Sequence, residues 1–138
     1  MKPKRTILCV DDDERSLSIR KIMLETRGYR VITCCDPDQA IQIMKSGGID
    51  LILADLMMPK RSGAQLVNEL KAISPPTPAI LFSGAVKFCT EECRAELFLP
   101  KGSYAPAELL ETIRTLLIRK RGPKRASEHA NFPGSFAC

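Results

Sequence analysis

Short apolar runs alternate along this chain with stretches of helical periodicity, and this alternation constrains the fold more than any other feature. Each run is short and ends at a charged or turn-forming residue, as a strand buried on both faces does. Strands are predicted over five ranges: 6–10, 30–34, 50–54, 79–82 and 96–99. Strands that alternate with helices indicate an α/β fold, here a doubly wound, five-stranded parallel sheet with helices on both faces.

Amphipathic helices are predicted between the strands. The apolar face of the first helix is expected to hold Leu17, Ile19, Ile22, Met23 and Leu24. Asp36 and Pro37 are a good helix start, because the carboxylate caps free N–H groups and proline fits the first helical position. Further helices are expected over about 63–73 and 106–118, whereas residues 86–95 offer at most two or three helical turns.

Length and charge predict one domain with a basic tail. A chain of 138 residues with 44% apolar content can form one complete core. Residues 119–138 hold five of the 21 basic residues but only one of the 16 acidic ones, and they show neither helical nor strand periodicity. We therefore expect a folded domain over residues 1–118 and a disordered tail over 119–138. Nucleic-acid binding by the tail is not expected, because no aromatic residue stands between its cations.

Neither a signal peptide nor membrane insertion is expected. Apolar stretches end well short of the roughly 18 to 20 residues that a membrane helix needs. The six cysteines have no regular spacing, so we expect reduced thiols and a cytoplasmic location. Two alternatives stay open: Cys89 and Cys93 could form a redox pair, or join His129 in a zinc site, although such a site needs four ligands.

Polar side chains follow the ends of four predicted strands, and they are Asp11, Asp12, Asp13, Asp55, Ser83 and Lys101. Because the working site of a doubly wound sheet lies at the carboxyl ends of its strands, these groups are expected to converge. Clustered carboxylates call for a cation, and oxygen ligands suit Mg²⁺. Such an ion also binds phosphate oxygens, so the pattern predicts phosphoryl transfer with Asp55 as the nucleophile. One of Asp12 and Asp13 is expected to cap the following helix instead.

These residues resemble the receiver domain of two-component response regulators. The resemblance covers about residues 4–118 and rests on Val10–Asp13, Asp55–Pro59 with Gly63, Ser83–Gly84 and Lys101. It implies a flavodoxin-like (βα)5 architecture and a single-domain response regulator of a phosphorelay. The roles that it implies are phospho-acceptor for Asp55, metal ligands for Asp11, Asp12, Asp55 and the Met57 backbone carbonyl, switch hydroxyl for Ser83, phosphate-pairing amine for Lys101, and switch aromatic for Phe98.

The resemblance also implies partners and a mode of action. A sensor histidine kinase or a phosphotransfer protein would supply the phosphoryl group with Mg²⁺, or alternatively Mn²⁺, and an aspartyl phosphate would alter contacts with a downstream protein. The chain would not be an enzyme beyond catalysing its own phosphorylation and slow dephosphorylation. Slow hydrolysis is expected because Met57 and Ala85 cannot activate a water. Gly102 stands where most receivers have a proline, and Pro100 precedes the lysine.

Two other functions compete with this one. A pseudo-receiver that acts as a phosphorylation-independent binding module remains the alternative, although neither the acceptor, the acidic pair nor the lysine is missing. A small phosphohydrolase would need a second acid near the nucleophile to activate water, commonly two residues on, and Met57 occupies that position.

Overall fold

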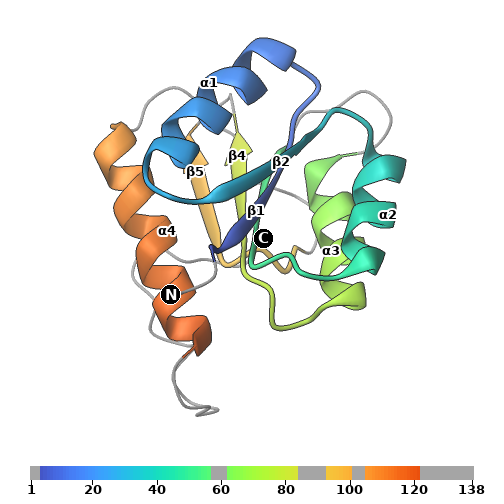
Figure 1. Ribbon diagram of the computed structural model, residues 1–138. Coiled ribbons are helices and arrows are strands. Elements are labelled where there is room, and N and C mark those ends of the chain that lie inside the picture. Colours follow the sequence, from blue (N-terminus) through green and yellow to red (C-terminus); the bar gives the residue numbers. More distant parts are fainter. Residues whose placement is uncertain (1–3, 57–61, 84–92, 101–104, 122–138) are drawn as a thin grey trace.

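The computed structural model describes residues 4–56, 62–83, 93–100 and 105–121, which form one open sheet with helices on both sides (Figure 1). The strands are β1 (Thr6–Val10), β2 (Arg30–Cys34), β3 (Leu51–Asp55), β4 (Ala79–Ser83) and β5 (Leu97–Pro100). They are parallel and lie in the order β2-β1-β3-β4-β5. The predicted doubly wound parallel sheet is therefore confirmed, with β3 and β5 shifted by one residue.

The described helices are α1 (Glu14–Thr26), α2 (Pro37–Ser46), α3 (Gly63–Ile73) and α4 (Pro106–Arg121). In Figure 1, α1 and α4 cover one face of the sheet, and α2 and α3 cover the other. Helix α4 continues to Arg121, beyond the end expected at about residue 118. Most of the helix expected over 86–95, and the tail from residue 122 onward, lie outside the described residues.

Each face of the sheet has its own apolar core. Along β1 the side chains alternate, with Ile7 and Cys9 packed beneath α1 and α4, and Leu8 and Val10 beneath α2 and α3. Every residue of β1 and β3 is buried. A strand covered on both faces has no polar side, which explains why the sequence shows these strands as continuous apolar runs.

Short polar side chains cap the amino ends of the first three helices. The Asp13 carboxylate accepts a hydrogen bond from the Arg15 backbone N–H at 3.0 Å, and so caps α1. Asp36 caps α2 in the same way, with proline at the first helical turn as predicted. Ser62 caps α3. These bonds satisfy N–H groups that have no partner within the helix, and they fix where each helix begins after its strand.

The predicted apolar face of α1 is partly wrong. Ile19 and Ile22 are 68% and 67% exposed, whereas the charged residue Arg20 is only 5% exposed. The buried positions of α1 are Leu17, Arg20 and Leu24, which follow one helical stripe. A prediction from apolar residues alone puts the buried face of α1 in the wrong place, because the buried stripe includes the charged residue Arg20.

A partly buried ion pair joins three segments at the amino ends of the strands. The Lys71 ammonium, on α3, donates to Glu96 Oε2 at 2.6 Å and to the Thr77 carbonyl at 3.0 Å. The other carboxylate oxygen of Glu96 accepts from the Ala79 N–H at 2.8 Å. This network ties the end of α3 to the start of β4 and to the residue preceding β5. It lies at the edge of the sheet opposite to the strand ends that carry Asp11 and Asp55.

No helix among the described residues is both long and apolar enough to cross a membrane. In the same part of the chain, Cys9, Cys34, Cys35 and Cys93 form no disulfide bond. The Cys89 partner proposed for Cys93 and the zinc candidate His129 lie outside the described residues.

Candidate functional site

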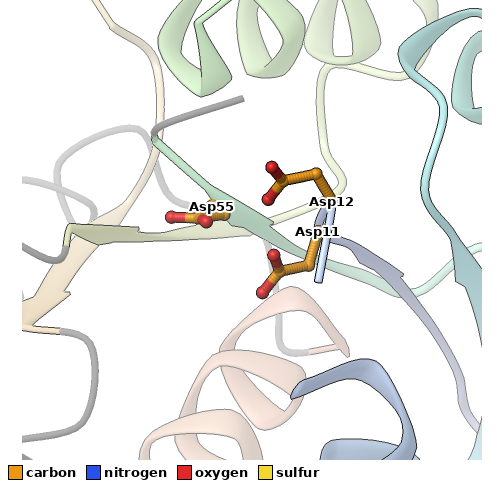
Figure 2. Close-up of side chains that lie close together, drawn as sticks. All are labelled: Asp11, Asp12 and Asp55. Carbon is orange, nitrogen blue, oxygen red and sulfur yellow. The ribbon is translucent and has the colours of Figure 1, made fainter. Parts of the chain in front are cut away.

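Three carboxylates meet where the strand order reverses. Asp11 and Asp12 directly follow β1, and Asp55 is the last residue of β3, the strand beside it. Figure 2 shows the three side chains at these neighbouring strand ends. One oxygen from each carboxylate lies within 4.8 Å of the others. The predicted convergence of these acids is thus what the geometry shows, at the position where doubly wound sheets bind ligands.

The three acids differ in their surroundings. Asp11 is fully buried and Asp55 is 4% exposed, whereas Asp12 faces solvent. Asp11 Oδ1 accepts from the Asp13 backbone N–H at 3.0 Å, which fixes the turn between β1 and α1. Asp13 itself is the helix cap, and its other oxygen accepts from the Ser16 hydroxyl. The cluster therefore has two buried acids and one acid that incoming ions can reach from solvent.

Close packing of α3 against the end of β3 positions Asp55. The strand pairing continues beyond Asp55, because the Leu56 N–H donates to the Phe82 carbonyl at 2.7 Å. The Leu56 carbonyl then accepts from the Gly63 N–H at 2.8 Å. A Cβ atom at Gly63 would collide with the carbonyl group of Asp55. Glycine therefore lets the first turn of α3 pack directly against the backbone of Asp55.

A buried arginine lies beside the acidic cluster. Nη1 of Arg20 is 3.7 Å from Asp11 Oδ2, and the two side chains are 6% and 0% exposed. The guanidinium carbon also stands 4.5 Å from the centre of the Phe82 ring, a cation–π arrangement. Sequence reasoning missed Arg20. The signal was available in the spacing of Leu17, Arg20 and Leu24, which places the arginine on the inner stripe of α1.

The thiol of Cys9, in β1, is a neutral neighbour of this charged region. Burial raises the pKa of Cys9 from 9.0 to about 12, partly opposed by Arg20 and reinforced by Asp11. A thiol in this state stays protonated at neutral pH and is a poor nucleophile and metal ligand. Cys9 therefore contributes to packing, and the chemistry of this site rests on oxygen atoms.

The remaining predicted site residues are only partly described. Ser83 ends β4 and pairs in register with Pro100, but its side chain lies outside the described part. Lys101, Met57 and the loop with Gly102 lie outside it altogether. Phe98 is half-buried and packs against the core beneath α2 and α3. The roles expected of these residues remain predictions.

The donor set fits a hard divalent cation. All three groups are carboxylates, and they are close enough for one ion to contact an oxygen of each. Mg²⁺ prefers oxygen ligands and is commonly held by one or two carboxylates together with waters. An acidic cluster with one solvent-exposed member matches that preference.

Comparison with known proteins gives the family. The family model of the response regulator receiver domain matches residues 7–114. The chain belongs to this family. The sequence and structural assignments agree, since the match reaches from Ile7 in β1 to Arg114 in α4 and so includes part or all of every described strand and helix.

Curated relatives of this receiver domain include transcriptional regulators. The chain is 33% identical over 129 residues to the transcriptional regulatory protein CpxR of Escherichia coli K12, an alignment that covers 91% of this chain and 54% of CpxR. It is 35% identical over 136 residues to the probable transcriptional regulator ycf27 of Cyanophora paradoxa, covering 93% of this chain and 54% of that protein. The chain thus spans about half the length of these relatives.

Solved receiver structures share the fold. A CheY-like receiver domain protein from Methanospirillum hungatei superimposes with a TM-score of 0.75 at 22% identity, covering 86% of this chain and 97% of the other. TrrA from Thermotoga maritima, a response regulator protein solved in complex with Mg²⁺ and BeF, gives a TM-score of 0.74 at 26% identity, covering 81% and 98%. The receiver domain described here has the CheY-like architecture.

Proposed function

We propose that this receiver domain accepts a phosphoryl group on Asp55, from a histidine kinase or a phosphotransfer protein, in a Mg²⁺-dependent step. The observation that carries the proposal is the meeting of Asp11, Asp12 and Asp55 within 4.8 Å at the reversal point of the sheet. The complex of the related TrrA with Mg²⁺ and BeF supports it. We further propose that the protein acts in the cytoplasm. Mn²⁺ is the alternative to Mg²⁺ as the bound ion.

The proposed metal ligands are Asp11, Asp12, Asp55 and the backbone carbonyl of Met57. A bound Mg²⁺ would offset the negative charge that gathers as the phosphoryl group approaches the acids. An oxygen of Asp55 forms a bond to phosphorus while the phosphorus–nitrogen bond of the donor phosphohistidine breaks and its imidazole leaves with the electron pair. Burial of Asp55 at a strand end holds this oxygen in place and restricts access of water.

The ends of β4 and β5 carry the groups proposed to respond to phosphorylation of Asp55. Lys101 would pair with a phosphoryl oxygen, and the Ser83 hydroxyl would hydrogen-bond to another. Phe98 would then move into the space that Ser83 leaves, and the surface around β5 and α4 would change for a downstream protein partner. Hydrolysis is expected to be slow, because neither Met57 nor Ala85 has a side chain that can activate water.

Intact mass after incubation with acetyl phosphate or phosphoramidate and Mg²⁺ tests the proposal. Wild-type protein is expected to gain one phosphoryl group, and the gain should disappear with Asp55→Asn or with a chelator. Asp38→Asn is the matched control, since Asp38 is an exposed acid on α2 outside the cluster. The adduct should persist for longer than a minute at neutral pH. No adduct with any donor would favour the phosphorylation-independent binding module instead.

A further inference from the structure

Arg20 occupies a position that packing alone would give to an apolar residue. It lies on the inner stripe of α1 between Leu17 and Leu24, and it is 5% exposed. Arginine is rarely buried to this extent without a charged partner. The side chain therefore carries a desolvation cost that some other interaction must offset.

The contacts of Arg20 are electrostatic. Its Nη1 atom is 3.7 Å from Asp11 Oδ2, too far for a hydrogen bond, and has no hydrogen-bond partner within the described part of the chain. The guanidinium instead lies over the Phe82 ring. A cation held by a carboxylate charge and a ring face, in surroundings that exclude water, interacts strongly with every charge near it.

The acidic cluster supplies those charges. Asp11 and Asp55 are buried, Asp12 adds a third carboxylate, and one oxygen of each lies within 4.8 Å of the others. Like charges at this separation repel unless a cation compensates them. Arg20 brings one positive charge to the inner side of Asp11, whereas an ion from solvent would approach on the side of the exposed Asp12.

We propose that Arg20 is a positioning residue, a built-in counter-ion that holds the acidic cluster together without metal and thereby lowers its affinity for Mg²⁺. This inference rests on the metal site of the proposed function. Two cations that share one set of carboxylates oppose each other, so the charge of Arg20 reduces the free energy gained by a second cation. This coupling is reciprocal, so Mg²⁺ binding weakens the electrostatic attraction between Asp11 and Arg20 by the same free energy.

Isothermal titration calorimetry with Mg²⁺ alone tests this, on wild-type protein and Arg20→Met. Methionine keeps an unbranched stem in the slot but removes the charge. We expect Arg20→Met to bind Mg²⁺ about tenfold more tightly or better, as a charge removed within several ångströms of a partly buried site implies. Arg20→Lys should restore an affinity close to that of the wild type. Arg114→Met is the matched control, because Arg114 is 63% exposed and pairs with Glu111 on α4.

Thermal unfolding gives a second readout. Without metal, Arg20→Met should unfold at a lower temperature than wild type, and saturating Mg²⁺ should raise its midpoint by more degrees than that of wild type. If Arg20→Met does not fold, Arg20→Gln carries the same comparison with a polar side chain in the slot.

The outcomes separate the two proposals. If Arg20→Met binds Mg²⁺ more tightly than wild type, while Arg20→Lys and Arg114→Met bind it with wild-type affinity, the counter-ion role is supported. Equal or weaker Mg²⁺ binding by Arg20→Met overturns it while leaving the metal site intact. Absence of Mg²⁺ binding in every variant, including wild type, overturns both the counter-ion role and the metal site.

Discussion

Gly63 has no side chain, and this allows α3 to pack directly against the backbone of Asp55. An alanine in a helix usually stabilises it by about 0.5 to 1 kcal/mol relative to glycine. Here the added Cβ would meet the Asp55 carbonyl, so we expect Gly63→Ala to destabilise the fold by about 1 to 3 kcal/mol. Urea unfolding checks the sign, and phosphorylation of Asp55 should slow as well. A gain in stability would show that α3 can move away without cost.

Cys9 predicts a loss of stability at alkaline pH. Its pKa is raised from 9.0 to about 12 in the folded state, because burial disfavours the thiolate. Above pH 9 the unfolded chain releases this proton while the folded chain keeps it. The free energy of unfolding should then fall by about 1.4 kcal/mol per pH unit until the folded pKa is reached.

Denaturant unfolding at pH 8 and pH 10.5 measures this effect. Cys9→Ala should show a shallower decline than wild type, and Cys35→Ala, at an exposed cysteine, should not. Some decline should remain in Cys9→Ala, because burial also raises the pKa values of Cys34 and Tyr29. Identical pH dependence in all three proteins would contradict the assignment.

Single residues also show how far the sequence could be interpreted. Asp11, Asp12 and Asp55 could be predicted as neighbours, because parallel strands place their carboxyl ends at one edge of the sheet. Arg20 could not be found from residue type, since arginine is normally exposed. Its spacing with Leu17 and Leu24 indicates the inner stripe of α1, but the carboxylate of Asp11 that compensates its charge lies outside that helix.

At the scale of elements, the Lys71–Glu96 pair joins α3, β4 and the segment before β5. Because Lys71 is 4% exposed, removal of its partner would leave a buried charge without compensation. We expect Glu96→Gln to cost about 1 to 3 kcal/mol of unfolding free energy. Lys71→Met should cost less, because an apolar side chain needs no counter-charge in that position.

Urea unfolding of both variants checks this order, with phosphorylation of Asp55 as the control measurement. The pair lies at the opposite edge of the sheet from the acidic cluster, so the extent of phosphorylation should not change in the folded protein. A larger loss from Lys71→Met than from Glu96→Gln would show that the methylene stem and the Thr77 contact matter more than the charge.

Element bounds were predictable at several places where the chain carries its own start or stop signal. Strand β1 ends directly before Asp11, α2 begins at Pro37 with Asp36 as its cap, and the range predicted for α3 is the one observed. The exposed face of α1 was not predictable from apolarity, since Ile19 and Ile22 point to solvent. Which stripe of a helix faces inward depends on the sheet beneath it, and that is a tertiary property.

At the scale of the molecule, the two acidic strand ends belong to the central strands of the sheet. Strands β1 and β3 are covered on both faces, and the chain between them forms α1, β2 and α2. The site is therefore placed at the ends of two strands that are packed on both faces. In contrast, we expect substitutions at solvent-facing positions of the helices to leave the geometry of the acidic cluster unchanged.

The non-local pairing of β1 with β3 has a consequence for how the protein matures. Asp11 and Asp55 meet only after the chain that forms α1, β2 and α2 has closed into a long loop. Such distant contacts form late, because closing the loop costs entropy before packing repays it. A chain that has collapsed but not yet paired these strands has no assembled cluster. If the proposed phosphoryl transfer takes place, only molecules that have finished folding would accept the phosphoryl group.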